Sequence, residues 1–518
     1  MFQTSIFKIF KYFNRQNTAL VIFLLILANY IGYGLIGGEE QYFALAKQYM
    51  QKDWMPHSFC LNDPAGYKLI FQVIFGFLLK FLSFEQLAFI SRFINFIFYA
   101  IPLSLIFKKL KFTNIEIIVI LQVGLFMHQS IWAGEWFFKN FEQKSLAYIF
   151  VFYAIYNLLI DKAYKSIIYA AIATYIHFLV GGWMALFLII YSLVRSRKIS
   201  EFIKHGALYF VLTLPFILFL ASQYIFNSEP SVIEGVNINR VYSVFRLKHH
   251  IGMFSDLRYF VNYHLGGVLI TIGLFLLCVF YFRKFKSPDI LKLNTLNIII
   301  FIQQFVFIGI ALIDKNGVLL KTYPFRTSSL SAFLILLEIA VIIKRFGLFS
   351  LFSYYRKKFP NIPYTQSRMH FALVMHLTLF LIFIPRFSIE ISDTIKNFYI
   401  GEDKLTEDMK DLILFSKNNT DPESVFLFLD SDKPFSFVRR AERDRFVINK
   451  FTPTNNQIIF EWYQRQLIKS KIAEDISNIS LLQDKYKVNY LVSEKSLLHK
   501  QLTLLKQFGT YYLYCIEQ

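Results

Sequence analysis

Cysteine is scarce in this sequence, which holds three thiols in 518 residues, at Cys60, Cys278 and Cys515. Cysteines so few and so widely spaced exclude a disulfide-framed secreted domain and a zinc site built on thiolates. A single bridge between Cys60 and Cys515 is the one pairing left open. The sequence also lacks internal repeats and low-complexity tracts, which excludes solenoid architectures.

Charged residues are sparse as well, at 17% of the chain, whereas 55% is hydrophobic and 19% is aromatic. Apolar runs recur as far as Pro385, and many approach the roughly 20 residues that cross a bilayer as a helix. The net charge of +20 comes from Lys and Arg in short segments between these runs, which is typical of membrane orientation signals. The composition therefore predicts a polytopic membrane protein that contacts membrane lipids, with no nucleic-acid partner.

The amino-terminal segment lacks a small-residue cleavage site and carries Lys8, Lys11 and Arg15 ahead of the first apolar run. We therefore expect a retained first span and a cytoplasmic amino terminus. Localisation in the cytoplasmic (inner) membrane follows, with the carboxyl-terminal domain outside the cytoplasm.

The apolar runs predict an α-helical membrane domain of about eleven spans. The stretch 67–81 is not counted, because Lys68, Gln72, Gly76 and Lys80 recur every four residues and indicate a helix lying in the headgroup plane. Leaving it out places Lys108, Lys109 and Lys111 in the cytoplasm, as the positive-inside rule prefers. The expected spans are 18–35, 88–107, 115–131, 146–160, 167–178, 182–194, 207–224, 266–282, 297–313, 328–343 and 370–385.

Two domains are expected. Residues 1–386 form the membrane domain, with a first outer loop at 37–87 that contains amphipathic helices. Residues 387–518 are richer in charge and form a small α/β domain outside the cytoplasm. Short strands are predicted at 425–429, 446–448, 489–492 and 511–514, and a helix at 456–471.

Glu39 and Glu40 are adjacent carboxylates at the point where the first span must leave the bilayer. One interpretation is favourable pairing with the positive end of the helix that follows. The other is a general base or a metal ligand at the membrane surface, since both need a partly shielded carboxylate. At this stage both interpretations stay open.

Further ionisable residues lie at the outer ends of later spans. Glu142 and Lys144 lead directly into a span, and ionisable residues at membrane depth are functional candidates. His177 precedes Gly181 and Gly182, where simple packing is the competing explanation.

A long outer loop carries the cations Lys248, His249 and His250, and Arg326 follows at the mouth of a later helix. Such cations suit an anionic ligand such as a phosphate. The competing explanations are a solvated loop, a lipid-headgroup contact or snorkelling. Together these residues predict an outer-face site for a membrane-anchored phosphate.

With these features in place, the chain resembles the GT-C superfamily of polytopic glycosyltransferases, and within it an uncharacterised bacterial family. The resemblance rests on Glu39-Glu40 after the first span, the first outer loop, Glu142 in the next outer loop, and the carboxyl-terminal domain. The outer-loop positions Lys248-His249-His250 and Pro324-Phe325-Arg326 match further positions of that family. Many members carry Asp where this chain has Glu.

The resemblance implies hexosyl or pentosyl transfer from a polyprenyl-phosphate-linked sugar to an acceptor glycan, lipid or protein. Glu39 or Glu40 would then take the proton of the acceptor hydroxyl. The departing phosphate would be neutralised by Lys144, His249, His250 and Arg326. Mg²⁺ or Mn²⁺ is an open cofactor, with Glu40 and Glu142 as candidate ligands. The alternatives are a transporter or flippase for a lipid-linked or anionic solute, and a non-catalytic membrane scaffold.

Overall fold

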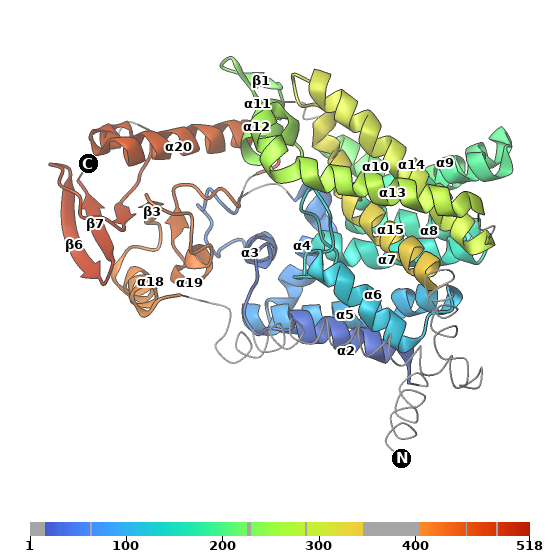
Figure 1. Cartoon of the computed structure of the whole chain (residues 1–518). Helices are drawn as coiled ribbons and strands as arrows, with labels where there is room; N and C mark the ends of the chain where they lie inside the picture. Colours follow the sequence, from blue (N-terminus) through green and yellow to red (C-terminus); the bar gives the residue numbers. More distant parts are fainter. Residues whose placement is uncertain are drawn as a thin grey trace, which may run out of the picture.

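A computed structural model describes residues 16–62, 65–224, 229–284, 287–344, 405–451, 453–482 and 485–517. A helical bundle makes up one side of the molecule, and a small domain containing a sheet makes up the other (Figure 1). The helix α20, Asn456–Glu474, extends from the sheet domain toward the loop region above the bundle (Figure 1). The α-helical membrane fold with a carboxyl-terminal α/β domain is confirmed. The boundary predicted at 386/387 lies outside the described residues.

Six helical segments of the described chain are long and apolar enough to cross a membrane, and each coincides with an expected span. Two of these six segments extend beyond one helix. The segment Leu257–Tyr281 joins α12 (Leu257–Phe260), η4 (Val261–Leu265) and most of α13. The segment Leu319–Ile342 joins η5 (Leu319–Thr322), η6 (Pro324–Thr327) and α15. The helices at the centres of the six are α5 (Phe84–Lys109), α9 (Phe178–Ser196), α10 (Ile199–Tyr224), α13 (Gly266–Lys284), α14 (Pro288–Ile313) and α15 (Ser328–Ile342).

Four other expected spans form shorter helices, so the described residues do not hold eleven full-length spans. The expected span at 370–385 lies outside the described residues. The first run stops being helical at Tyr30, and its C-cap Ile31 is extended. Beyond this point the buried Arg92 donates a hydrogen bond to the Gly34 carbonyl. The shorter helices are α2 (Thr18–Tyr30), α6 (Asn114–Phe126), α7 (Gln143–Leu159) and α8 (Ala163–Ile176).

The first outer loop holds α3 (Glu39–Met50), η1 (Gly66–Lys68) and α4 (Leu69–Leu78). With ten residues α4 is too short to span, as predicted, but its polar stripe does not face headgroups. Gln72 and Gly76 are buried, and a Cβ at Gly76 would lie 2.1 Å from the Ala46 carbonyl oxygen. The middle of the stripe is therefore buried, with Gly76 packed closely against α3, whereas Lys68 lines a cavity and Lys80 is exposed.

The carboxyl-terminal domain is built on a five-stranded sheet of order β4-β3-β5-β7-β6. Strands β3, β4 and β5 are parallel, and β7 and β6 add an antiparallel edge. The predicted strands are confirmed near three positions, β4 lies just before its predicted place, and β6 was missed. Their bounds are β3 Val425–Phe428, β4 Asp444–Arg445, β5 Tyr490–Ser493, β6 Leu502–Phe508 and β7 Tyr511–Ile516.

Helices pack on this sheet, and the predicted helix at 456–471 is confirmed as α20. Helix α18, Glu407–Asn419, and helix α19, Phe437–Ala441, share a core with the sheet. The buried Trp462 of α20 donates its indole N–H to the Ile448 carbonyl at 3.1 Å. This contact fixes α20 against the segment that follows β4.

The domain docks on the first outer loop through buried polar contacts. Asp444 accepts hydrogen bonds from the Ser58 hydroxyl at 2.6 Å and from the Phe59 N–H at 2.8 Å. Arg439 of α19 bonds both carboxylate oxygens of Glu40, at 2.8 and 2.9 Å, and Glu85 at 2.7 Å. Because buried charges need partners, these contacts fix the domain in one position.

Candidate active site

A cavity of about 510 Å³ lies where the carboxyl-terminal domain meets the mouths of the membrane helices. Its walls come from the first outer loop, the loop that leads into α7, and the start of α9. The long loop after α10, the segment before α15 and the carboxyl-terminal domain complete them. Polar and charged lining residues include Gln41, Tyr42, Tyr67, Lys68, Glu135, Glu142, Lys144, His177, Tyr242, Arg246, His249, His250, Lys321, Tyr323, Arg326, Asp432, Asn449 and Lys450. The predicted residues Glu142, Lys144, His177, His249, His250 and Arg326 are therefore brought together.

The described lining is cationic, with six Lys or Arg side chains against three carboxylates. A low-dielectric wall focuses the field of such charges into the cavity and attracts anions. The cavity is therefore suited to a phosphate or another anionic group.

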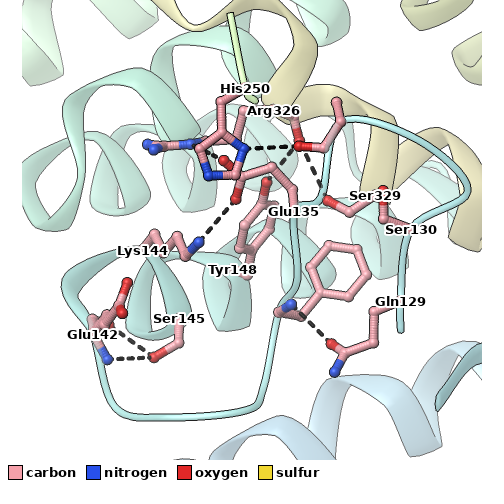
Figure 2. Close-up of polar contacts among 12 residues, drawn as sticks. Gln129, Ser130, Glu135, Glu142, Lys144, Ser145, Tyr148, His250, Arg326 and Ser329 are labelled. Carbon is pink, nitrogen blue, oxygen red and sulfur yellow. Dashed lines mark hydrogen bonds and ion pairs between the residues drawn. The ribbon is translucent and has the colours of Figure 1, made fainter. Parts of the chain in front are cut away.

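Glu135 is at the centre of the charged network (Figure 2). Its two oxygens accept from Lys144 Nζ at 2.9 Å and from Arg326 Nε at 3.0 Å. Burial alone would raise the pKa of the Glu135 carboxyl, but Lys144 and Arg326 hold it well below its usual range. The carboxylate is thus ionised and orients two cations toward one region of the cavity.

Two neutral histidines complete this network. His177 Nε2 accepts from Arg326 Nη1 at 2.9 Å, while burial and the Arg326 charge push the pKa of His177 well below 6.5. His250 Nδ1 lies 2.8 Å from the Ala133 carbonyl oxygen, so this nitrogen carries the proton and donates (Figure 2). Burial lowers the pKa of His250 to about 4. His250 therefore presents a neutral ring and not the cation expected from the sequence.

Contacts made by the segment before α15 hold Arg326 in position. The Gln303 amide donates to the Pro324 carbonyl at 3.0 Å, and the Tyr323 hydroxyl lies 2.9 Å from that of Tyr242. The Arg326 guanidinium stacks over the Tyr323 ring at 4.4 Å. Snorkelling is excluded as the explanation of Arg326, because its charge is held inside the protein.

Glu142 lines the cavity at the start of α7 and forms a capping box with Ser145. Its carboxylate accepts from the Asn140 amide at 3.0 Å, and no ion pair between described residues includes it. Gly38 lies against the carboxylate, since a Cβ there would stand 2.0 Å from Oε1. Glu142 is therefore held in place and open to the cavity.

Glu39 and Glu40 are not part of the cavity lining, although the family resemblance implied that one of them takes the acceptor proton. Glu39 is fully buried, pairs with Arg92 at 3.2 Å, and accepts from the Phe141 N–H at 2.6 Å. Glu40 is bound by Arg439. In the described structure both carboxylates join parts of the protein.

Lys248 also lies apart from the lining. Its ammonium pairs with Asp256 at 2.7 Å and stacks near the Tyr259 ring. Both members of the ion pair are partly exposed, which makes it a surface contact of small energetic value.

A divalent cation has no ready-made set of ligands here. The described residues contain no group of three His, Cys, Asp or Glu side chains placed to hold a metal ion. Of the two candidate ligands, Glu40 is bidentate on Arg439, and Glu142 is in the cavity wall. The Cys60–Cys515 bridge is also absent, because both are free thiols.

Four further residues of the cavity lining were not predicted as site residues from the sequence: Lys68, Glu135, Tyr323 and Lys450. Glu135 lies nine residues before its partner Lys144 in an irregular loop, where no helical or strand period relates them. Lys450 belongs to the other domain. Its signal is weak, because one Lys in a charged domain is not distinctive.

No protein-family model and no curated protein matches this sequence. The fold is similar to crystal structures of ArnT from Cupriavidus metallidurans. The apo state aligns with TM-score 0.45 and 12% identity over 99% of this chain and 98% of that chain. The structure bound to undecaprenyl phosphate aligns with TM-score 0.46 and 14% identity over the same shares.

Proposed function

We propose that the chain is a membrane glycosyltransferase that moves a sugar from a polyprenyl-phosphate-linked donor to an acceptor at the mouth of the cavity. The observation that carries the proposal is the convergence of Lys144, Arg326 and the open carboxylate Glu142 on one cavity beside the membrane helices. An anion site next to a carboxylate base is what such a transfer requires. The GT-C resemblance of the sequence points the same way.

The donor phosphate lies against Lys144 and Arg326 in this proposal. When the bond from the sugar's anomeric carbon to the phosphate oxygen breaks, its electron pair stays on that oxygen. The added negative charge is stabilised by cations that Glu135 has already oriented, so little reorganisation is needed. Polyprenyl phosphate leaves.

Glu142 is the general base in this proposal, in place of Glu39 or Glu40. The acceptor hydroxyl attacks the anomeric carbon, and its proton passes to the Glu142 carboxylate. General-base catalysis contributes roughly 10²- to 10⁴-fold to such steps. Glu39 and Glu40 have structural roles next to the site. Glu39 accepts a hydrogen bond from the N–H of Phe141, the residue before Glu142.

The lipid chain has an apolar approach to the cavity. Phe178 and Leu179, at the start of α9, form part of the cavity wall. Nearby α4 exposes Val73, Ile74 and Phe77. Exposed apolar side chains on a membrane protein are suited to acyl or prenyl contact.

A transporter would need polar groups available along a path through the bundle. Several polar groups within the bundle are instead bonded to one another. Asn294 donates to Glu338 at 2.9 Å, Gln304 donates to Thr327 at 3.2 Å, and Gln303 is committed to Pro324. This arrangement favours structural roles for them.

The proposal is tested in cells whose chromosomal copy is deleted and replaced by wild type, Glu142→Gln or Glu116→Gln at matched protein levels. Glu142→Gln should remove the outer-surface glycan that wild type restores, whereas Glu116→Gln, in a partly exposed pair with Lys344, should restore it. Identical glycans with wild type and Glu142→Gln would point to the scaffold alternative.

A further inference from the structure

Lys450 is the cation that the carboxyl-terminal domain contributes to the cavity. It is partly buried, and among the described residues it has neither a hydrogen-bond nor an ion-pair partner. Burial lowers the pKa of Lys450, the Glu142 carboxylate opposes this effect, and Arg246 and Lys144 lower the pKa further. A partly buried ammonium among other cations is costly unless an anion joins it.

Two residues of the membrane domain share this region. Arg246 ends η2 (Val241–Arg246), and His249 follows it in the cavity wall. All three side chains line the same cavity, where burial and the charges of Arg246 and Lys450 lower the pKa of His249. Lys144 and Arg326 are instead held by the two oxygens of Glu135.

The two halves of this set come from different domains and are kept in register by direct packing. Phe245, next to Arg246, contacts Trp462 and Tyr463 of α20 with ring centroids 6.0 and 5.1 Å apart. Glu229 accepts from the Gln457 N–H at 2.8 Å. Docking of the domain therefore fixes Lys450 relative to Arg246.

We propose that Arg246, His249 and Lys450 form a second anion-binding subsite, which takes a phosphate or carboxylate carried by the acceptor. This inference rests on the proposed function. The acceptor is the substrate concerned, because Lys450 lies near Glu142, which takes the acceptor proton. The donor phosphate is assigned to Lys144 and Arg326, which Glu135 orients, and this leaves the Lys450 side of the cavity for a second anion.

The test uses the full-length protein in uncharged phosphatidylcholine nanodiscs, first saturated with undecaprenyl phosphate. Inorganic phosphate is then titrated, with glucuronate as the carboxylate probe and glucose as the neutral control. At least one of the two anions should bind while the lipid phosphate stays bound. Lys450→Met should lower the affinity for that anion about tenfold or more, because one charge-assisted hydrogen bond is lost.

Lys450→Arg should retain anion binding, and Lys410→Met, in an exposed pair with Glu407, should leave it unchanged. None of the three substitutions should alter the affinity for undecaprenyl phosphate. Displacement of the anions by undecaprenyl phosphate, or equal binding by wild type and Lys450→Met, would overturn the second subsite. If undecaprenyl phosphate fails to bind while anion binding still depends on Lys450, the proposed function fails and the subsite remains.

Discussion

Glu135 is the residue on which the charged network depends, because this single buried carboxylate pairs with both Lys144 and Arg326. Removing one member of a buried pair costs roughly 3–5 kcal/mol, since the remaining charge stays buried without compensation. Glu135→Gln should therefore lower the free energy of unfolding by about that amount. Glu116→Gln, in the partly exposed pair with Lys344, should cost about 1 kcal/mol or less. Equal losses in the two variants, measured by reversible denaturant unfolding, would show that Glu135 does not hold the network.

Glu39 has a pH signature of its own. Burial raises its pKa from 4.5 to about 7 against the attraction of Arg92. The folded protein thus holds this proton to higher pH than the unfolded chain does. The stability that the group contributes is full below about pH 4.5 and is lost as the pH rises through about 7. The unfolding free energy of wild type minus that of Glu39→Gln should fall from about pH 5 to 7.5 and then level. A difference that grows with pH would contradict this assignment.

At the level of elements, the turn that begins α3 sets the position of Glu142. A Cβ at Gly38 would stand 2.0 Å from Glu142 Oε1, so Gly38→Ala should displace that carboxylate while α3 still forms. Sugar transfer should fall by roughly the 10²- to 10⁴-fold that a general base supplies. Gly206→Ala in α10 meets nothing within 4 Å and serves as the matched control. If both variants keep the transfer rate of the wild type, Glu142 is not the general base.

Helix α19 is the element that ties the two domains together, through Arg439. Arg439→Met leaves Glu40 and Glu85 without their cation, and we expect a loss of about 3–5 kcal/mol in docking free energy. Amide hydrogen exchange should quicken at residues 51–62 and 437–445, which face each other across the junction. Lys410→Met in the same domain should leave the amide exchange at these residues unchanged. Unaltered exchange in Arg439→Met would show that other contacts hold the domain.

The sequence predicted those elements and site residues whose signal is local. Lys144, His177 and Arg326 stand at helix mouths, where a charged or titratable group is conspicuous among apolar residues. The roles of Glu39 and Glu40 depend on partners that no local pattern reveals. Arg92 is inside a predicted span, and Arg439 is 399 residues away from Glu40. The prediction of a cationic His250 was wrong for the same reason, since burial by distant segments keeps its ring neutral.

For the whole molecule, the proposed function requires that the cavity between the membrane helices and the carboxyl-terminal domain binds a lipid-linked phosphate. The most direct measurement is the titration of the full-length protein in nanodiscs with undecaprenyl phosphate and, separately, with undecaprenol. We expect saturable binding of the phosphate, at least tenfold weaker binding of the alcohol, and a similar loss for the phosphate in Lys144→Met. Equal binding of the two lipids, or binding of the phosphate that Lys144→Met does not change, would contradict the account.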